Sequence, residues 1–221
     1  MANKKIILPH VIACEGIDAE NFIRYFLEFL YKKQPELDNN FFVYNFGGNE
    51  ELLTFLKSFD NFLLDGLKVK SLLVIRDAET DGNAAEKSVK DALKKNSFPV
   101  PDTACRLKNW AQNERNINTA YALFPSLDSN INGTLEDLCL QILKRDTAEE
   151  LLKISDNALC EAADKFGKFT RPHKNRLYTY LSLEDSFVSL KLGEAAKANA
   201  FNFESERLCT LKNILNEIIE A

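Results

Sequence analysis

The sequence predicts an α/β protein with a central, mostly parallel sheet flanked by helices and a helical layer toward the C-terminus. The first observation is that three short apolar runs, HVIACEG, FFVYNF and KSLLVIRD, are each followed by a turn and a segment with helical spacing. Such alternation is typical of parallel strands joined by right-handed crossovers. The second is that apolar residues beyond about Asp146 follow helical spacing, with few strand signals between them.

The first of these units lies near the start of the chain. HVIACEG combines β-branched and small apolar residues and ends in Glu15-Gly16, which predicts a buried strand and then a turn. We expect Asp18 to cap a helix that continues to about Lys33. Its apolar residues recur at intervals of three and four: Phe22, Ile23, Phe26, Leu27 and Leu30.

The second and third units follow the same pattern. FFVYNF ends at Gly47-Gly48, and Asn49 is predicted to cap the next helix. KSLLVIRD is nearly continuous in apolar residues, as expected of a strand covered on both faces, and it ends at Asp77. A helix is expected over about 83–95, after the turn AETDG.

The next stretch, from Ala104 to Phe124, is strand-like in ACRLK and INTAYALF, and a helix is expected to begin near Thr134. With 221 residues and 45% hydrophobic content, the chain is long enough for one large core and short for two full domains. We therefore expect an α/β domain over 1–146 and a helical extension over 147–221 that packs on the same domain.

Charge and cysteine usage restrict the location and the partners. The formal charge is −5 and the pI is about 5.3, which argues against a generally basic surface, although a local basic patch can still hold phosphate. Five cysteines form no CxxC pair, as expected of reduced thiols. The apolar start is interrupted by Pro9, His10 and Glu15, and no stretch approaches membrane-spanning length. We expect a cytoplasmic protein without a membrane partner.

Carboxylates stand at the ends of two predicted strands. Glu15 ends the first and Asp77 the third, with Glu79 two residues on and Asp81 in the turn or at the helix cap. The carboxyl ends of parallel strands meet at one edge of a sheet, where ligands usually bind. Crowded carboxylates raise one another's pKa or take up a cation, and Mg²⁺ or Mn²⁺ suits oxygen ligands. The alternatives are a solvated turn residue for Glu15 and a plain cap for Asp81.

A second acidic pair occurs in GTLEDLCLQIL. Thr134 with Asp137 three residues later forms a possible capping box, which explains Asp137 structurally. Glu136 has no such explanation. It contributes to the same metal site or lies on a solvated helix face, and both interpretations stay open.

With these residues in this order, the sequence resembles the Toprim domain, especially bacterial Toprim-like proteins of unknown function related to overcoming-lysogenization-defect nucleases. VIACEGIDAENFIRYFL is similar to the opening strand and helix of that family, and LLVIRDAETDG occupies the place of its Asp-x-Asp motif. The likeness extends loosely through GTLEDLCLQIL, HKNRLYTYL and NAFNFESERLCTLKNIL. The second Asp of the motif appears here as Glu79, or the motif has shifted toward Asp81.

The resemblance implies a Toprim-like Rossmannoid fold and a metal-dependent activity on phosphodiesters. In that family the first Glu acts as general acid or base or as a metal ligand, and the Asp pair holds Mg²⁺. Carried over, Glu15, Asp77 and Glu79 form the core, and Glu136 would serve a second ion. The resemblance also implies nucleic acid as partner, DNA rather than RNA, and a separate partner ATPase.

One late segment, KFGKFTRPHKNR, concentrates basic groups: Lys165, Lys168, Arg171, His173, Lys174 and Arg176. It is either a phosphate-facing surface, with Lys174 as an auxiliary catalytic residue, or a solvated loop before a helix. Gly47-Gly48 fits a tight turn better than a phosphate cradle, because no GxGxxG or GxxxxGK[ST] motif is present. His10 and His173 are the only histidines, so a Ser-His-Asp triad cannot be argued.

Three functions follow from these observations. The first is a Mg²⁺-dependent nuclease or related phosphoryl-transfer enzyme. The second is a non-catalytic Toprim-like module that regulates a partner or binds nucleic acid or metal, motivated by Glu79 and the net negative charge. The third is an α/β protein that binds a small phosphorylated ligand at the same sheet edge.

Overall fold

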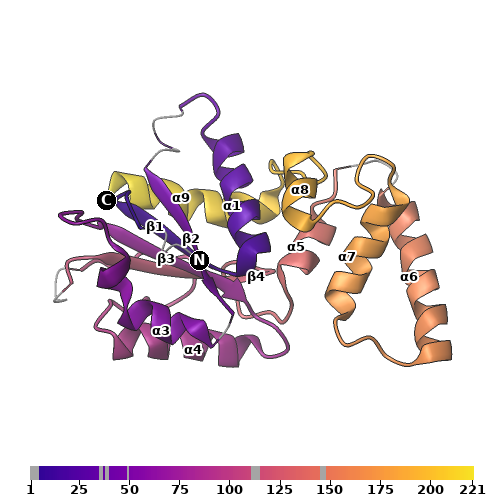
Figure 1. Cartoon of the computed structure of the whole chain (residues 1–221), viewed down its shortest axis with the longest axis horizontal. Coiled ribbons are helices and arrows are strands. Elements are labelled where there is room, and N and C mark those ends of the chain that lie inside the picture. Colours follow the sequence, from indigo (N-terminus) through magenta and orange to yellow (C-terminus); the bar gives the residue numbers. More distant parts are fainter. Residues whose placement is uncertain (1–4, 35–36, 38–39, 49, 111–114, 145–147) are drawn as a thin grey trace.

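A parallel β-sheet forms the centre of the protein, in a computed structural model that describes residues 5–34, 37, 40–48, 50–110, 115–144 and 148–221 (Figure 1). Its four strands are β1 (His10–Glu15), β2 (Phe41–Gly47), β3 (Ser71–Asp77) and β4 (Asn118–Phe124). They lie in the order β2-β1-β3-β4, and every pair is parallel. The predicted α/β class is therefore confirmed.

Helices pack on one face of the sheet and form a large hydrophobic core with it (Figure 1). This face carries α1 (Gly16–Leu30), α5 (Leu135–Gln141), α8 (Leu192–Lys197) and α9 (Cys209–Glu220). The predicted apolar stripe of α1 is buried there, and Phe22 meets Phe124 of β4 edge to face at 6.3 Å. α8 packs closely on α1, since a Cβ at Gly193 would lie 2.5 Å from Asn21 Cβ.

The opposite face has its own core cluster. It is covered by α3 (Glu51–Lys57), the 3-10 turn η1 (Phe59–Phe62) and α4 (Gly82–Lys95). Phe55 is central, because its ring lies 4.9 Å from that of Tyr44 and 5.6 Å from that of Phe59. Burial on both faces explains why the β3 run is almost wholly apolar.

The C-terminal helices divide into two groups. α6 (Ala148–Phe166) and α7 (Pro172–Leu183) form a hairpin that projects beyond the sheet (Figure 1). Arg176 of α7 donates two hydrogen bonds, of 2.7 and 2.8 Å, to the carboxylate of Asp156 in α6. The chain then returns through α8 and η2 (Glu206–Leu208) to α9, which lies on the sheet core. The helical character predicted beyond about Asp146 is found in the described residues.

Two local predictions were wrong. Asp18 does not cap α1, because the helix begins at Gly16, whose φ of 82° turns the chain directly out of β1; Asp18 therefore lies inside the first turn. ACRLK forms no strand, because Cys105 has φ 51° and interrupts extended backbone. The run bonds to β4 at two separate points, since Cys105 N donates to Tyr121 O and Lys108 forms an isolated bridge with Thr119.

Two predicted helix starts are confirmed. The Asp81 side chain accepts a 3.0 Å bond from Ala84 N and caps α4. Thr134 and Asp137 form the capping box of α5. The predicted cap at Asn49 lies outside the described residues.

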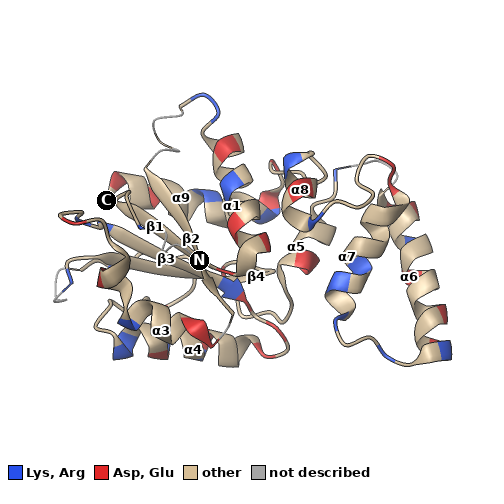
Figure 2. Cartoon of the chain, viewed as in Figure 1, with Lys and Arg blue, Asp and Glu red and all other residues tan. Residues whose placement is uncertain are grey.

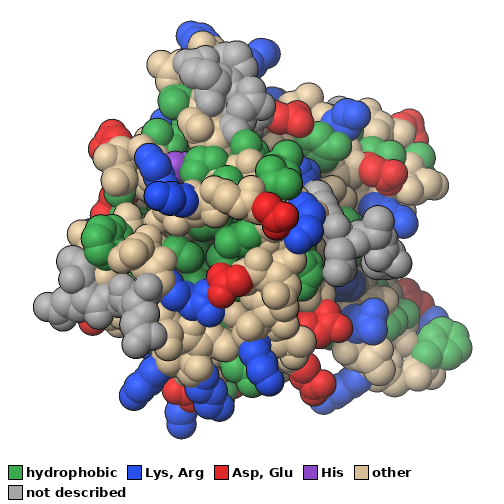
Figure 3. Space-filling model, turned by 60° about the vertical axis from the view of Figure 1, so that its left-hand side comes forward, with side chains coloured by type: hydrophobic (Ala, Val, Ile, Leu, Met, Phe, Trp, Pro, Cys, Tyr) green, Lys and Arg blue, Asp and Glu red, His purple; other side chains and the backbone are tan. Residues whose placement is uncertain are grey.

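Lys, Arg, Asp and Glu occur on most of the helices (Figure 2). Figure 2 shows Lys and Arg on α7 next to the acidic helix α6, and on the face in Figure 3 the visible acidic and basic side chains are interspersed. Within the described part of the chain, no helix is long and apolar enough to cross a membrane.

A buried histidine at the start of β1 predicts acid sensitivity. His10 is 4% exposed, and its Nδ1 lies 2.9 Å from Ser71 Oγ. Burial, and then the charge of Lys70, lower the pKa of His10 from 6.5 to about 4. The unfolded chain therefore binds a proton more tightly between those values, so stability is lost as the pH falls through that window. We expect His10 to account for at most about 3 kcal/mol of this loss.

The measurement is denaturant unfolding of the wild type and of His10→Gln between about pH 7 and about pH 4. The difference in unfolding free energy between the two proteins should shrink or reverse as the pH falls, because Gln does not titrate. A difference that is independent of pH would contradict the assignment.

Candidate functional site

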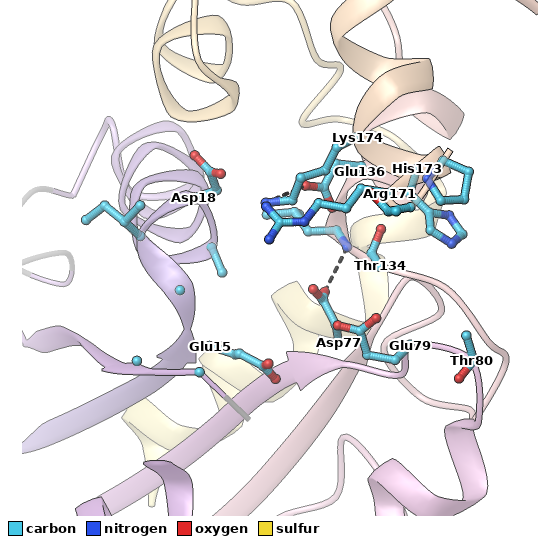
Figure 4. Close-up of a pocket in the computed structure, with 18 residues that line it drawn as sticks. Glu15, Asp18, Asp77, Glu79, Thr80, Thr134, Glu136, Arg171, His173 and Lys174 are labelled. Carbon is cyan, nitrogen blue, oxygen red and sulfur yellow. Dashed lines mark hydrogen bonds and ion pairs between the residues drawn. The ribbon is translucent and has the colours of Figure 1, made fainter. Parts of the chain in front are cut away.

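The strand order creates a crevice between β1 and β3. The connection that leaves β1 leads to β2 on one side, and the connection that leaves β3 leads to β4 on the other, so the connections diverge at the carboxyl ends of β1 and β3. Ligands of open α/β sheets usually bind at such a switch point. A pocket of about 660 Å³ lies here, lined by the ends of β1, β2 and β3 and by the starts of α1, α5 and α7 (Figure 4).

Four of the predicted carboxylates line this pocket: Glu136, and the three that form what we call its acidic floor, Glu15, Asp77 and Glu79 (Figure 4). Asp77 Oδ1 accepts a 2.9 Å bond from Leu135 N. Burial and then the charge of Glu136 raise the pKa of Asp77 well above its usual range, and the other two floor carboxylates add to the effect. The site thus holds negative charge that the folded protein compensates only in part.

Glu15 has an unexpected neighbour, the buried Arg76. Glu15 Oε2 lies 3.4 Å from Arg76 Nε, yet this buried oxygen makes no hydrogen bond to any residue that the structure describes. Burial raises the pKa of Glu15, although the Arg76 charge opposes the shift. Sequence reasoning missed Arg76. The available signal was its position directly before Asp77, since pairing of Cys14 with Ile75 places the next residues of both strands side by side.

Strand alternation limits how closely the floor carboxylates converge. Glu15 follows Ala13 on the face of the α3 and α4 core, whereas Asp77 follows Ile75 on the face of the α1 and α9 core. The two side chains therefore reach the sheet edge from opposite faces. Accordingly, among the described residues no three His, Cys, Asp or Glu side chains are already grouped to hold a metal ion.

The segment after β3 separates the other two predicted ligands. Glu79 has φ 55° and exchanges backbone bonds of 2.8 and 2.7 Å with Gly133, which ties the floor to the loop before α5. Its side chain lines the pocket. Asp81 does not belong to the lining, and its oxygen serves the α4 cap.

Opposite the floor, the start of α7 supplies a basic roof, which we define as Arg171 and Lys174 (Figure 4). Lys174 Nζ lies 3.5 Å from Oε1 of Glu136, a side chain that is 4% exposed. Glu136 is therefore neither solvated nor free of a partner. It lies between the floor and the roof, because its charge acts on Asp77 and its carboxylate pairs with Lys174.

The other basic residues of the predicted phosphate surface have different positions. Lys165 pairs with Glu161 within α6, and Arg176 pairs with Asp156. Lys168 is exposed and does not line the pocket. The basic segment therefore contributes to the pocket through its last turn before α7 and the first turn of that helix.

The sequence predicts no site role for Asp18 and includes His173 only as a member of the basic segment. Asp18 lines the pocket, and burial raises its pKa against the charges of Lys174 and Lys191. His173 also lines the pocket, and its Nδ1 lies 2.7 Å from Asp137 Oδ2. The signal for Asp18 was its place just after Glu-Gly. No local signal pointed to the His173 contact, since its partner is 36 residues away.

Gly47 and Gly48 also line the pocket, as the turn that ends β2. Their amides are already used within the turn, since Gly47 N donates to Asn45 Oδ1 and Gly48 N to Glu51 Oε2. This favours the tight-turn interpretation over a phosphate cradle.

The fold and the site together define an α/β protein with a polar pocket at the switch point of its parallel sheet. The chain belongs to the family described as protein of unknown function (DUF3226), whose model matches residues 9–220. No curated protein and no solved structure matched the chain. The family match includes the strands that form the acidic floor and the helix that forms the basic roof.

Proposed function

We propose that this protein is a nuclease that hydrolyses phosphodiester bonds in this pocket with the aid of Mg²⁺ or Mn²⁺. One observation carries the proposal: the acidic floor and the basic roof face each other across one cavity (Figure 4). Carboxylates suit a hard cation, and Arg and Lys suit a phosphate. With a divalent cation bound to the floor, a phosphodiester between the two surfaces would meet positive charge on both sides.

The donor chemistry of the floor fits a divalent cation. Within the described part of the chain, a buried oxygen of Glu15 has no hydrogen-bond partner, and burial and neighbouring carboxylates raise the pKa of Asp77. A cation would offset both costs. Mg²⁺ commonly keeps several waters and binds through one or two carboxylates, so a set of three closely grouped side chains is not required. We assign Glu15, Asp77 and Glu79 to this role and leave out Asp81 and Glu136, which have other partners.

The chain's own residues orient the substrate. Arg171 and Lys174 would hold the phosphate that is cleaved or the one beside it, and Lys174 would share its charge between that phosphate and Glu136. A bound divalent ion would neutralise developing negative charge and activate water. The carboxylates of the floor would keep the phosphate away from the sheet edge itself, because they repel it without a cation.

The substrate and the partner remain predictions that rest on the Toprim resemblance. We propose nucleic acid as substrate, with DNA ahead of RNA, and a separate ATPase as a partner. The exposed Lys168 next to the roof provides additional positive charge for a polymeric substrate.

Calorimetric titration of Mg²⁺ and Mn²⁺ into the protein, followed by cleavage assays on supercoiled and single-stranded DNA and on RNA, tests the proposal. We expect metal binding, and cleavage only with metal. Asp81→Asn is the control, because it keeps the helix cap and changes a carboxylate outside the pocket; it should bind and cleave like the wild type. Absence of both binding and cleavage would overturn the proposal, and binding without cleavage would favour the non-catalytic module.

A second candidate is binding of a small phosphorylated ligand. It is favoured by the pocket volume of about 660 Å³ and by the first turn of α1, which lines the pocket and has no side-chain cap. This candidate would be favoured if a nucleoside monophosphate bound saturably in the absence of metal and the protein did not cleave DNA.

A further inference from the structure

The histidine of the pocket is held by a carboxylate that is itself fixed. His173 Nδ1 lies 2.7 and 2.8 Å from the two oxygens of Asp137. Asp137 Oδ2 also accepts from Thr134 N at 2.8 Å and from Thr134 Oγ1 at 3.2 Å, as part of the α5 capping box. The ring is thus oriented by a side chain that belongs to a rigid helix start.

This contact has a consequence for the protons of the ring. An ionised carboxylate only accepts hydrogen bonds, so Nδ1 must carry a proton. In the neutral ring Nε2 is then the unprotonated nitrogen, a proton acceptor on the side of the ring away from Asp137. His173 lines the pocket and its side chain is 38% exposed, so water and substrate can reach it.

We propose that His173 is the general base of this pocket and that Asp137 is its positioning residue; the inference rests on the proposed nuclease function. Nε2 would take a proton from the attacking water as the water oxygen bonds to phosphorus and the bond to the leaving oxygen breaks. The leaving oxygen would take its proton from solvent, to which His173 later returns the one it received. An imidazole held in one tautomer by a carboxylate suits this task.

Charged groups from three helices lie around His173 and its partner Asp137. Glu136 and Asp137 belong to α5, Arg171 and Lys174 flank the ring on its own helix, and Arg176 lies within reach of the Asp137 charge. Asp156 of α6 neutralises Arg176. Any pH profile must therefore be compared with that of a variant that lacks the ring.

The first test is kinetic. His173→Ala should lower kcat for Mg²⁺-dependent cleavage of supercoiled DNA by about 10²- to 10⁴-fold, with KM changed less than about threefold. Added imidazole should restore part of the rate. A kcat within about threefold of the wild type, or a loss that imidazole does not rescue, would overturn the proposal.

The second test needs no substrate. Because the chain has only two histidines, ¹⁵N NMR of the imidazole nitrogens can assign the tautomer of His173. We expect the Nδ1–H form in the wild type. In Asp137→Asn the amide oxygen can stay on Thr134 N, so the NH₂ group would face Nδ1 and move the ring proton to Nε2. That variant should keep its fold and lose kcat.

The outcomes separate the two proposals. The Nε2–H tautomer in the wild type overturns the general-base assignment, whatever the activity. A wild type that shows the Nδ1–H form but cleaves no nucleic acid overturns the nuclease proposal, and the catalytic role of His173 falls with it. Cleavage by the wild type that survives in Asp137→Asn with unchanged kcat overturns the positioning role alone.

Discussion

Asp77→Asn is expected to make the protein more stable while it abolishes metal-dependent cleavage. In the folded protein the pKa of Asp77 is raised by burial and by neighbouring carboxylates, so the fold binds the Asp77 proton more tightly than the unfolded chain does. The contribution of Asp77 to stability is therefore fully present below the unfolded pKa near 3.8 and is lost as the pH rises through the folded value. At neutral pH the neutral amide should add at least about 1 kcal/mol to the unfolding free energy.

The same substitution removes a charged ligand from the acidic floor. Asn can still accept the bond from Leu135 N, so the local fold should persist. We expect cleavage to fall by at least about 10³-fold, and calorimetry to show weakened Mg²⁺ binding. Asp77→Ala should lose the same activity without the gain in stability, because it leaves Leu135 N without its acceptor.

The matched control is Asp81→Asn, which makes the same chemical change at a carboxylate that caps α4 outside the pocket. It should leave cleavage at the wild-type rate. If Asp77→Asn is destabilised at neutral pH, or cleaves at the wild-type rate, the charge repulsion in the floor or its catalytic role has been assigned wrongly.

Lys174→Ala is expected to weaken nucleic-acid binding and to lower stability through a different group. Loss of one phosphate contact should raise KM about tenfold and reduce the slope of log affinity against log salt by about one. It also leaves the carboxylate of Glu136, which is 4% exposed, without its cation. Because Lys174 is itself about half exposed, we expect a stability loss of no more than about 1 kcal/mol.

A second substitution separates the two effects. Glu136→Gln added to Lys174→Ala should restore the unfolding free energy, because no uncompensated buried charge remains, but it should not restore the salt slope. Lys168→Ala is the control for general charge, since that lysine lies in the same basic segment and outside the pocket lining. A larger binding defect in Lys168→Ala than in Lys174→Ala would contradict the assignment of the roof.

Much of the fold was predictable because its signals are local. The apolar runs that end at Glu15 and Asp77 locate two strands, and their neighbours in sequence determine the turns that follow. The caps at Asp81 and Thr134 could be identified from residues three positions away, since a cap bonds only to its own first turn. The two wrong predictions, a cap at Asp18 and a strand in ACRLK, arose where single backbone angles decided the outcome.

The pocket was predictable in part. Parallel order alone placed Glu15 and Asp77 at the same sheet edge, and both line the cavity. The ion pair between Arg76 and Glu15 could not be predicted from composition, because it depends on the register between β1 and β3. Composition also could not decide whether Glu136 is a metal ligand or a solvated residue, because its partner, Lys174, belongs to the distant helix α7.

The sequence by itself thus determined the strands, the helix caps and the chemical type of each site residue, since these depend on neighbours within a few positions. Only the tertiary structure decided that the start of α7 lies over the carboxyl edge of the sheet. That placement brings Lys174 to Glu136 and His173 to Asp137, pairs separated by more than thirty residues. Contacts at such separation depend on how the whole helical hairpin packs against α5, and no local pattern encodes that geometry.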